Sequence, residues 1–246
     1  MGKIYEALEK AQRERKGEKK PPLFVVLSPG ERPSTGFEIA AENEMVALSR
    51  NIDALLETSP KKVVQFIGSQ GGEGTSTVVR DFAMVSAARF GKTVLLLDAD
   101  PGTPSQHLFF HLQPKFGWEE ILRNKRTLKK AICRIGDTKL HVYPTPPGSA
   151  SLPEALFSPG IKEFWEAAKE KFDLVLIDSA PASASPDGIS LSRYVDGVVL
   201  VLEAEKTRKP VAENLKNRIL RNGGNLLGMV FNNRRYHIPE SVYKRL

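Results

Sequence analysis

The sequence VVQFIGSQGGEGTST occupies residues 63–77. Its first five residues form a short run without polar alternation, which is typical of a strand buried on both faces. After the glycines, Val78, Phe82 and Val85 recur with the period of a helix. Glycines let backbone N–H groups turn inward, and the N-terminus of the following helix adds a partial positive charge. The stretch therefore predicts a strand, a phosphate-binding loop and a helix, in that order.

Six residues of the loop and the first helical turn are candidate phosphate-binding residues: Gly71, Gly72, Gly74, Thr75, Ser76 and Thr77. The hydroxyl of Ser76 or Thr77 stands where a P-loop places its magnesium ligand. The lysine that follows the last glycine of this motif is absent, because that position is Thr75. A glycine-rich turn that binds nothing is therefore the alternative interpretation.

Two further apolar runs end in acidic residues. Asp98 and Asp100 follow the run 93–97, and Asp178 follows the run 174–177. In a parallel sheet, ligands bind at the carboxyl ends of the strands. Acids at such strand ends, beside a phosphate loop, can hold magnesium or its water. The alternative is that each acid caps the next helix or stays solvated.

The order of apolar runs indicates the fold class. Five runs lack polar alternation, and helical stretches separate them. Strand and helix alternating in this way predict an α/β, three-layer P-loop fold with a mostly parallel sheet and helices on both faces. The five runs are 63–67, 93–97, 174–177, 197–202 and 226–231.

The chain is expected to have three parts. Residues 1–20 form a basic amphipathic N-terminal helix, with Ile4, Leu8 and Ala11 on its apolar face. Residues 21–60 form a connector and a helix, since prolines and Ser-Pro-Gly punctuate the connector. Residues 61–246 form a P-loop nucleotide-binding-type domain.

Composition excludes several classes of protein. Cys133 is the single cysteine, so an intramolecular disulfide and a thiolate zinc site are both excluded. No run approaches the roughly 18 apolar residues of a membrane span, and a signal-peptide apolar region is missing, so we expect a cytoplasmic protein. His107 and His111 are four residues apart but lack the glutamate of a HExxH motif. A packed helix face is expected there rather than zinc.

The net charge of +7 is concentrated at the two ends of the chain. Basic ends can meet an anionic membrane surface, nucleic acid or an acidic partner, or can simply be a solvated surface. The aromatic residues are not interleaved with basic ones, as they are on single-strand nucleic-acid platforms. No specific nucleic acid is therefore expected as a partner.

Three segments together carry a family resemblance. The loop at 68–77, the Asp98-Ala99-Asp100 segment with Pro104 and His107 downstream, and the segment Asp178-Ser179-Ala180-Pro181 resemble the bacterial tyrosine autokinases of capsule and exopolysaccharide assembly. These proteins are related to the septum-site and partitioning ATPases. The resemblance implies that ATP or ADP and Mg²⁺ are the cofactors. It implies the following roles: phosphate and magnesium binding for Gly72, Gly74 and Ser76, metal binding and catalysis for Asp98, Asp100 and Asp178, and adenine binding for Asn232.

The departures from the family pattern all affect charge. Thr75 replaces the catalytic lysine, and Gly102 stands where the family has an arginine. Val46 and Ser49 take the places of the paired arginines of the oligomerisation helix, although Glu44 remains. A loop lysine faces the β and γ phosphates, and electrostatic stabilisation is the largest catalytic factor in phosphoryl transfer. We therefore expect weakened nucleotide binding and impaired catalysis in a regulatory or scaffold subunit.

Two alternatives stay open. The first is an active ATP-dependent tyrosine kinase, in which Arg80 or a neighbouring subunit supplies the missing cation and Tyr236 or Tyr243 accepts phosphate. The second is a positioning ATPase of the partitioning type, whose basic ends would bind membrane or DNA. Nonspecific binding of DNA or lipid that weakens steeply as the salt concentration rises would identify the positioning ATPase.

The resemblance also implies a partner, a membrane-embedded polysaccharide chain-length regulator or co-polymerase. Ile4, Tyr5 and Leu8 form a stripe too small to anchor in a bilayer alone, so a protein partner suits it better than lipid. The protein would then be peripheral at the inner face of the membrane. A homo-oligomer is a further expectation. The alternative to attachment is that the N-terminal helix folds back onto its own domain.

Overall fold

The computed structural model describes residues 23–26, 41–117, 120, 130–149 and 161–234. The predicted N-terminal helix, Tyr236 and Tyr243 lie outside these residues. Eight strands form one sheet in the described part of the chain, in the order β1-β8-β7-β2-β6-β3-β5-β4. The strands are β1 (Leu23–Val26), β2 (Lys62–Gly68), β3 (Val94–Ala99), β4 (Cys133–Arg134), β5 (Leu140–Tyr143), β6 (Leu174–Ser179), β7 (Gly197–Glu203) and β8 (Leu226–Asn232).

The five predicted strands are confirmed as β2, β3, β6, β7 and β8, and all pairs among them are parallel. Every residue of β2, β3 and β6 is buried, which is the reason their sequences show no polar alternation. Only the pair β4 and β5, at one edge of the sheet, is antiparallel among the described strands. The predicted fold class is therefore confirmed.

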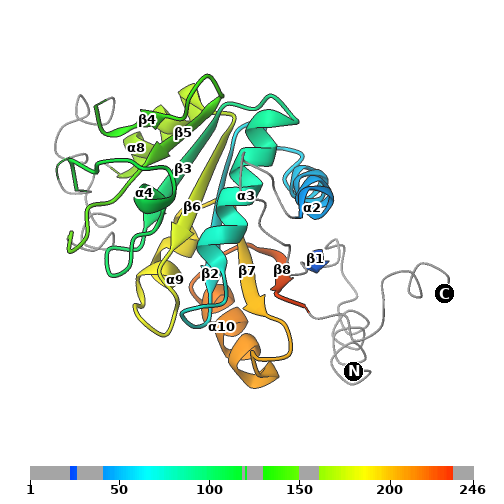
Figure 1. The fold of residues 1–246 in the computed structure, drawn as a ribbon. Coiled ribbons are helices and arrows are strands. Elements are labelled where there is room, and N and C mark those ends of the chain that lie inside the picture. The colour runs from blue at the N-terminus through cyan, green and yellow to red at the C-terminus, as the bar shows by residue number, and fades with distance from the viewer. Residues whose placement is uncertain (1–22, 27–40, 118–119, 121–129, 150–160, 235–246) are drawn as a thin grey trace.

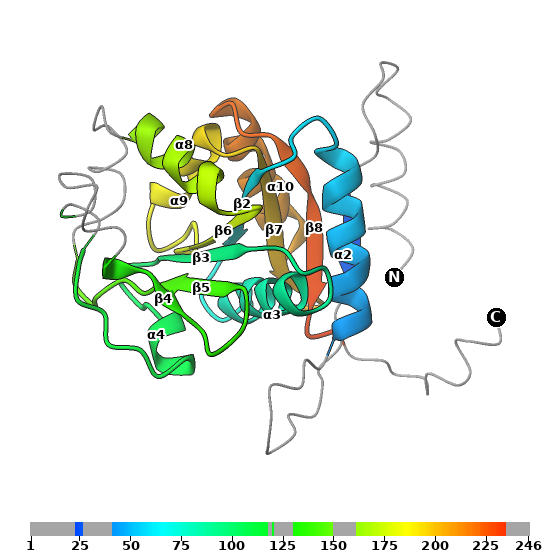
Figure 2. The same cartoon turned by 90° about the horizontal axis from the view of Figure 1, so that it is seen from above.

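Helices cover both faces of the sheet, as Figures 1 and 2 show. On one face, α3 (Thr75–Ala88) packs against the strands, and α2 (Glu42–Leu55) packs against α3. On the other face lie α8 (Ile161–Lys171), α9 (Asp187–Leu191) with the 3-10 helix η1 (Ser192–Tyr194), and α10 (Lys209–Arg221). The short helix α4 (Gln106–Phe109) lies just beyond the end of β3. This arrangement leaves the carboxyl ends of the central strands to form a site.

Three strands were not anticipated from the sequence. Strand β1 pairs in parallel with β8, so part of the segment predicted as a connector belongs to the sheet. Strands β4 and β5 have two and four residues, too few to show a periodicity of their own.

None of the described helices is both long and apolar enough to span a membrane.

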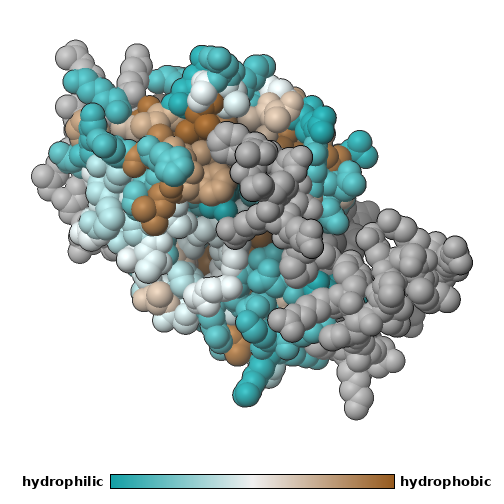
Figure 3. Space-filling view, in the orientation of Figure 1, coloured by the Kyte–Doolittle hydropathy of each residue, from teal (hydrophilic) through white to brown (hydrophobic). Residues whose placement is uncertain are grey.

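Figure 3 shows hydrophilic residues interspersed with apolar ones on the face seen there. The large apolar side chains that are most exposed in the described part of the chain are Phe90, Leu108, Phe109 and Leu220. Two of these, Leu108 and Phe109, belong to α4, beside the carboxyl ends of the strands.

Candidate functional site

The loop between β2 and α3 has the backbone of a phosphate nest. Gly72 and Gly74 have φ angles of 87° and 84°, in the left-handed region that favours glycine. Gly74 is the N-cap residue of α3, and a Cβ atom there would clash with the side-chain nitrogen of Asn232. The first N–H groups of α3 have no acceptor within the helix and carry its partial positive charge. The loop predicted from the sequence therefore exists, and its geometry suits an anion.

Glu73 fixes the shape of this loop. Its carboxylate accepts hydrogen bonds from the N–H groups of Ser69 and Gln70, at 2.5 and 2.9 Å, and from the hydroxyl of Ser69. Thr207, in the loop after β7, donates to the same carboxylate at 2.5 Å. The Asn232 side chain, at the end of β8, donates to the Glu73 carbonyl oxygen at 3.0 Å. Glu73 and Thr207 were not predicted from the sequence, although an acid inside a glycine-rich loop is a visible signal.

A cleft of about 350 Å³ opens between this loop and the ends of β3 and β6. It contains all six loop residues predicted from the sequence, together with Asp100. Asn232 does not line the cleft but contacts the loop through Glu73. Asp98 and Asp178 do not line it either, because they are buried beneath it, with 0% and 1% of their surfaces exposed. The residues that line the cleft are Gln70, Gly71, Gly72, Glu73, Gly74, Thr75, Ser76, Thr77, Arg80, Asp100, Thr103, Ser105, Ser179 and Pro181.

The two buried acids face each other across neighbouring strands. Asp98 of β3 and Asp178 of β6 are register partners. Desolvation raises the pKa of Asp98, and the charge of Asp178 raises it further. Desolvation also raises the pKa of Asp178, against hydrogen bonds from Gln106 and Ser76 that lower it. A positive charge, either a proton or a divalent cation, would therefore stabilise this pair of carboxylates.

The acids also organise the chain around them. Asp98 accepts hydrogen bonds from the N–H groups of Ser105 and Gln106 at 3.0 Å, so it holds the start of α4, as the capping alternative expects. Asp100 accepts from the N–H groups of Gly102 and Thr103 at 3.0 and 3.1 Å. Asp178, near the end of β6, instead accepts a hydrogen bond from the side chain of Gln106.

Gln106 is a further residue of the site that was not predicted from the sequence. Its side chain is fully buried and donates to Asp178 at 2.7 Å and to the Ser76 carbonyl oxygen at 3.0 Å. It therefore connects the start of α3 with the end of β6. No sequence pattern distinguishes this glutamine from a surface glutamine, because its role depends on α4 folding over the site.

Comparisons with known proteins identify the family. No protein-family model matches the chain. The tyrosine-protein kinase YwqD of Bacillus subtilis is 32% identical over 188 residues, which are 75% of this chain and 78% of YwqD. The chain belongs to the bacterial tyrosine-protein kinase family. Its relatives are kinases of capsule and exopolysaccharide systems.

Solved structures show the same fold. The chimerical protein CapA2B2 has a TM-score of 0.77 at 22% identity, with 87% of this chain and 95% of that chain covered. The septum-site-determining protein MinD of Pyrococcus horikoshii, solved with Mg-ADP, has a TM-score of 0.57 at 20% identity, with 75% and 76% covered. Both solved structures therefore share the α/β fold of this chain.

Thr75 and Gly102, two of the departures expected from the family resemblance, occupy defined places in the structure. Thr75 is the first residue of α3, and its hydroxyl lies 2.7 Å from where a Cβ of Gly68 would be, at the base of the loop. Gly102 lies in the turn held by Asp100. Neither position carries charge toward the cleft. Arg80, on the second turn of α3, is the only Lys or Arg among the described residues that line it.

The residues present fit a nucleotide and Mg²⁺. Cβ atoms added at Gly71 and Gly72 would meet nothing within 4 Å, so this part of the loop borders open space at the cleft. Mg²⁺ prefers oxygen ligands and is usually held by one or two carboxylates together with substrate phosphates. Ser76 and Asp178, with Asp98 beside them, offer such oxygens. The described residues contain no cluster of three or more His, Cys, Asp or Glu that could hold a metal without phosphate.

Proposed function

We propose that this member of the tyrosine-protein kinase family is a nucleotide-binding regulatory or scaffold subunit in which phosphoryl transfer is impaired. One observation supports it above the others: the phosphate nest is complete in its backbone, while its lysine position is Thr75. Backbone N–H groups supply much of the binding of a polyphosphate, and they are retained. The charge that stabilises the transition state is lost.

The proposed ligands are ATP or ADP with Mg²⁺. The phosphates would lie against Gly72, Gly74 and the first turn of α3, and Ser76 with Asp178 would hold the metal. When bound, Mg²⁺ would neutralise charge on the transferring phosphoryl group. Asn232 lies beside the loop at the end of β8, and adenine binding remains its proposed role. The Mg-ADP bound to the related fold of MinD supports this choice of ligand.

The proposed catalytic loss follows from electrostatics. A preorganised positive charge beside the β and γ phosphates acts where charge develops during transfer, and no reorganisation is needed. Removing a single preorganised donor typically costs about two to three orders of magnitude in turnover. Thr75 cannot supply that positive charge. Gly102 stands where the family has an arginine, so it cannot supply a second positive charge either. The aspartates remain, but they act on the metal and the attacking group.

The test is autophosphorylation with radiolabelled ATP. The unchanged protein should transfer no detectable label to its tyrosines, including Tyr236 and Tyr243. The variant Thr75→Lys should bind ATP more tightly. Rapid labelling of the unchanged protein would instead support an active kinase, which the presence of Arg80 in the cleft keeps as the second candidate.

The proposed partner is a membrane-embedded co-polymerase or chain-length regulator of polysaccharide assembly. Support comes from relatives that belong to capsule and exopolysaccharide systems. The protein would then be peripheral at the inner face of the membrane, and residues 1–20 would attach it. Co-purification of the full chain with membranes, lost when residues 1–20 are deleted, tests this proposal.

A further inference from the structure

Arg80 is a buried cation at the wall of the phosphate cleft. It stands on α3, four residues after Ser76 and five after Thr75, so it lies about one turn beyond the first turn of the helix. The residue is 7% exposed, yet it lines the cleft together with Thr77, Asp100 and Thr103. A charge at such a site is costly unless anionic or polar groups surround it.

Several contacts, among them an ion pair of its Nε with the Asp81 carboxylate at 4.0 Å, fix the orientation of the guanidinium group. It lies 3.8 Å from the centroid of the Phe109 ring, which is a short stacking distance for a cation and an aromatic ring. It also donates to the Thr77 hydroxyl at 3.3 Å. A guanidinium group presents its N–H donors in a planar fork that matches the geometry of a phosphate group. Arg80 is thus positioned before any ligand arrives.

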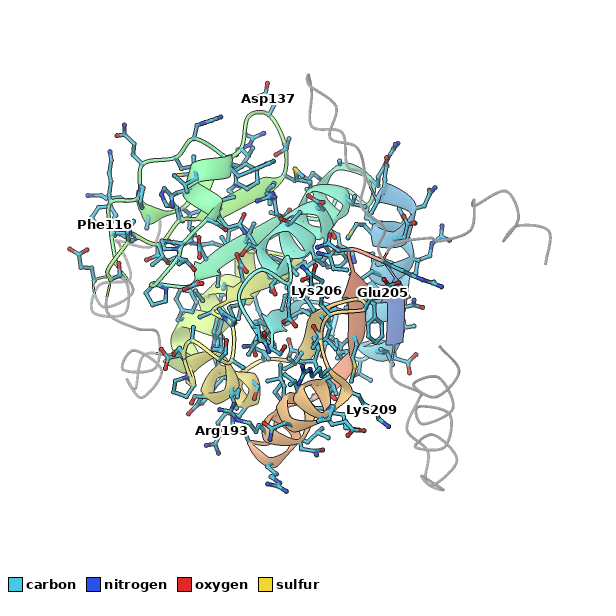
Figure 4. The ribbon with its side chains drawn as sticks, turned by 60° about the horizontal axis from the view of Figure 1, so that its bottom comes forward. Phe116, Asp137, Arg193, Glu205, Lys206 and Lys209 are labelled. Atoms are coloured by element: carbon cyan, nitrogen blue, oxygen red, sulfur yellow. The ribbon has the colours of Figure 1, made fainter. Side chains whose placement is uncertain are left out.

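Other cations near the loop are less suited to this task. Lys206 pairs with Glu203 at 2.7 Å and is 74% exposed, and Lys209 lies 3.6 Å from Glu213 on α10. Figure 4 labels both lysines on the side of the molecule formed by β7 and α10. Neither lines the phosphate cleft.

The electrostatic balance of the site points the same way. Asp98, Asp100 and Asp178 place three acids at or just after the strand ends, and Arg80 is the only Lys or Arg among the described residues that line the adjoining cleft. With Thr75 neutral, an incoming triphosphate would meet these acids without a lysine to offset them. From this geometry we infer that Arg80 binds the phosphates of the nucleotide in place of the lysine that Thr75 replaces. This inference rests on the proposed nucleotide binding.

The test compares affinities for ATP with Mg²⁺ by calorimetry, with the full chain. Arg80→Met should weaken binding about ten- to a hundredfold, the range expected for one hydrogen-bonded charge. Arg193→Met is the matched control, because Arg193 lies on η1 and does not line the cleft. It should leave the affinity unchanged. In the Arg80→Met background, Thr75→Lys should restore affinity, and by a larger factor than in the parent.

Phe109→Leu keeps the inference testable if Arg80→Met fails to fold. Phe109 is 38% exposed and holds the guanidinium plane without lining the cleft, so its loss should weaken ATP binding severalfold. Leu108→Ala, next to it and 66% exposed, is the control. Arg80 would be only a counter-ion of the aspartates if Arg80→Met lowered the melting temperature but changed ATP affinity less than about twofold. That result, or equal effects of Thr75→Lys in both backgrounds, overturns the inference. A parent protein that binds no ATP overturns the proposed function first.

Discussion

Replacing Asp178 by asparagine should stabilise the metal-free protein at neutral and alkaline pH. Asparagine keeps the shape of the side chain and an oxygen that can accept the 2.7 Å hydrogen bond from Gln106. It removes a negative charge that is 1% exposed and faces Asp98 across neighbouring strands. The pKa values of both acids are raised, chiefly by desolvation, so their ionisation opposes folding.

The expected size follows from the strand spacing. Two charges on adjacent strands lie about 5 Å apart, which corresponds to a repulsion of roughly 3 kcal/mol at an effective dielectric constant of about 20. The hydrogen bond from Gln106 becomes a neutral one and loses about 1 kcal/mol. A net stabilisation of about 1 to 3 kcal/mol should remain, or a rise of several degrees in melting temperature.

The sign of the pH dependence is fixed by the raised pKa values. Below about pH 4, the ordinary carboxyl pKa, both folded and unfolded chains are protonated, and Asp178 costs nothing. As the pH rises toward the raised folded-state pKa, the unfolded chain loses its proton first, and the stability of the parent falls. The advantage of Asp178→Asn should therefore be small at about pH 4 and should grow as the pH rises through about 6 and about 8, the raised pKa values of Asp178 and Asp98.

Urea denaturation in EDTA, at about pH 4 and about pH 8, measures this difference by linear extrapolation. Asp187→Asn is a suitable control, because this acid lies in the first turn of α9, outside the cleft. The reasoning would be refuted if Asp178→Asn lost more than about 1 kcal/mol at pH 8, because the carboxylate would then be a net structural acceptor. A gain that did not change with pH would refute the charge argument alone.

Three further predictions concern the loop and the N-terminus. Glu73→Gln should lower the free energy of unfolding by about 1 to 3 kcal/mol, because a buried carboxylate that accepts several hydrogen bonds is lost, and urea denaturation measures it. Thr75→Lys should tighten ATP binding in calorimetry, since the nest would regain a charge beside the phosphates, and an unchanged affinity would mean that the loop binds no phosphate. Deletion of residues 1–20 should abolish co-purification with membranes at an unchanged melting temperature, whereas membrane association retained with a lower melting temperature would favour a helix that folds back onto the domain.

The central part of the fold was predictable because its strands are buried on both faces. Strands β2, β3 and β6 have no exposed residue, so their apolar runs stand out in the sequence, and the glycine loop marks where α3 begins. Edge strands carry less information. Strand β1 has four residues and β4 has two, and their pairing depends on backbone bonds to strands far away in the sequence.

Much of the candidate site was predictable for the same reason, since the loop and the strand-end acids have fixed places in a parallel sheet. Gln106 and Thr207 were not, because each reaches the site from a loop or short helix whose path no local pattern determines. Arg80 was visible as a cation, but its approach to the cleft depends on the packing of Phe109 against it.

Equilibrium binding of radiolabelled ATP to the purified full chain, with the same samples examined for label on tyrosine, tests the central claim most directly. We predict saturable, magnesium-dependent binding of one nucleotide per chain, with no label transferred to Tyr236 or Tyr243. Binding without transfer would mean that the nest functions and the catalytic charge is lost. Rapid labelling of the tyrosines, or no ATP binding at any accessible concentration, would contradict the account.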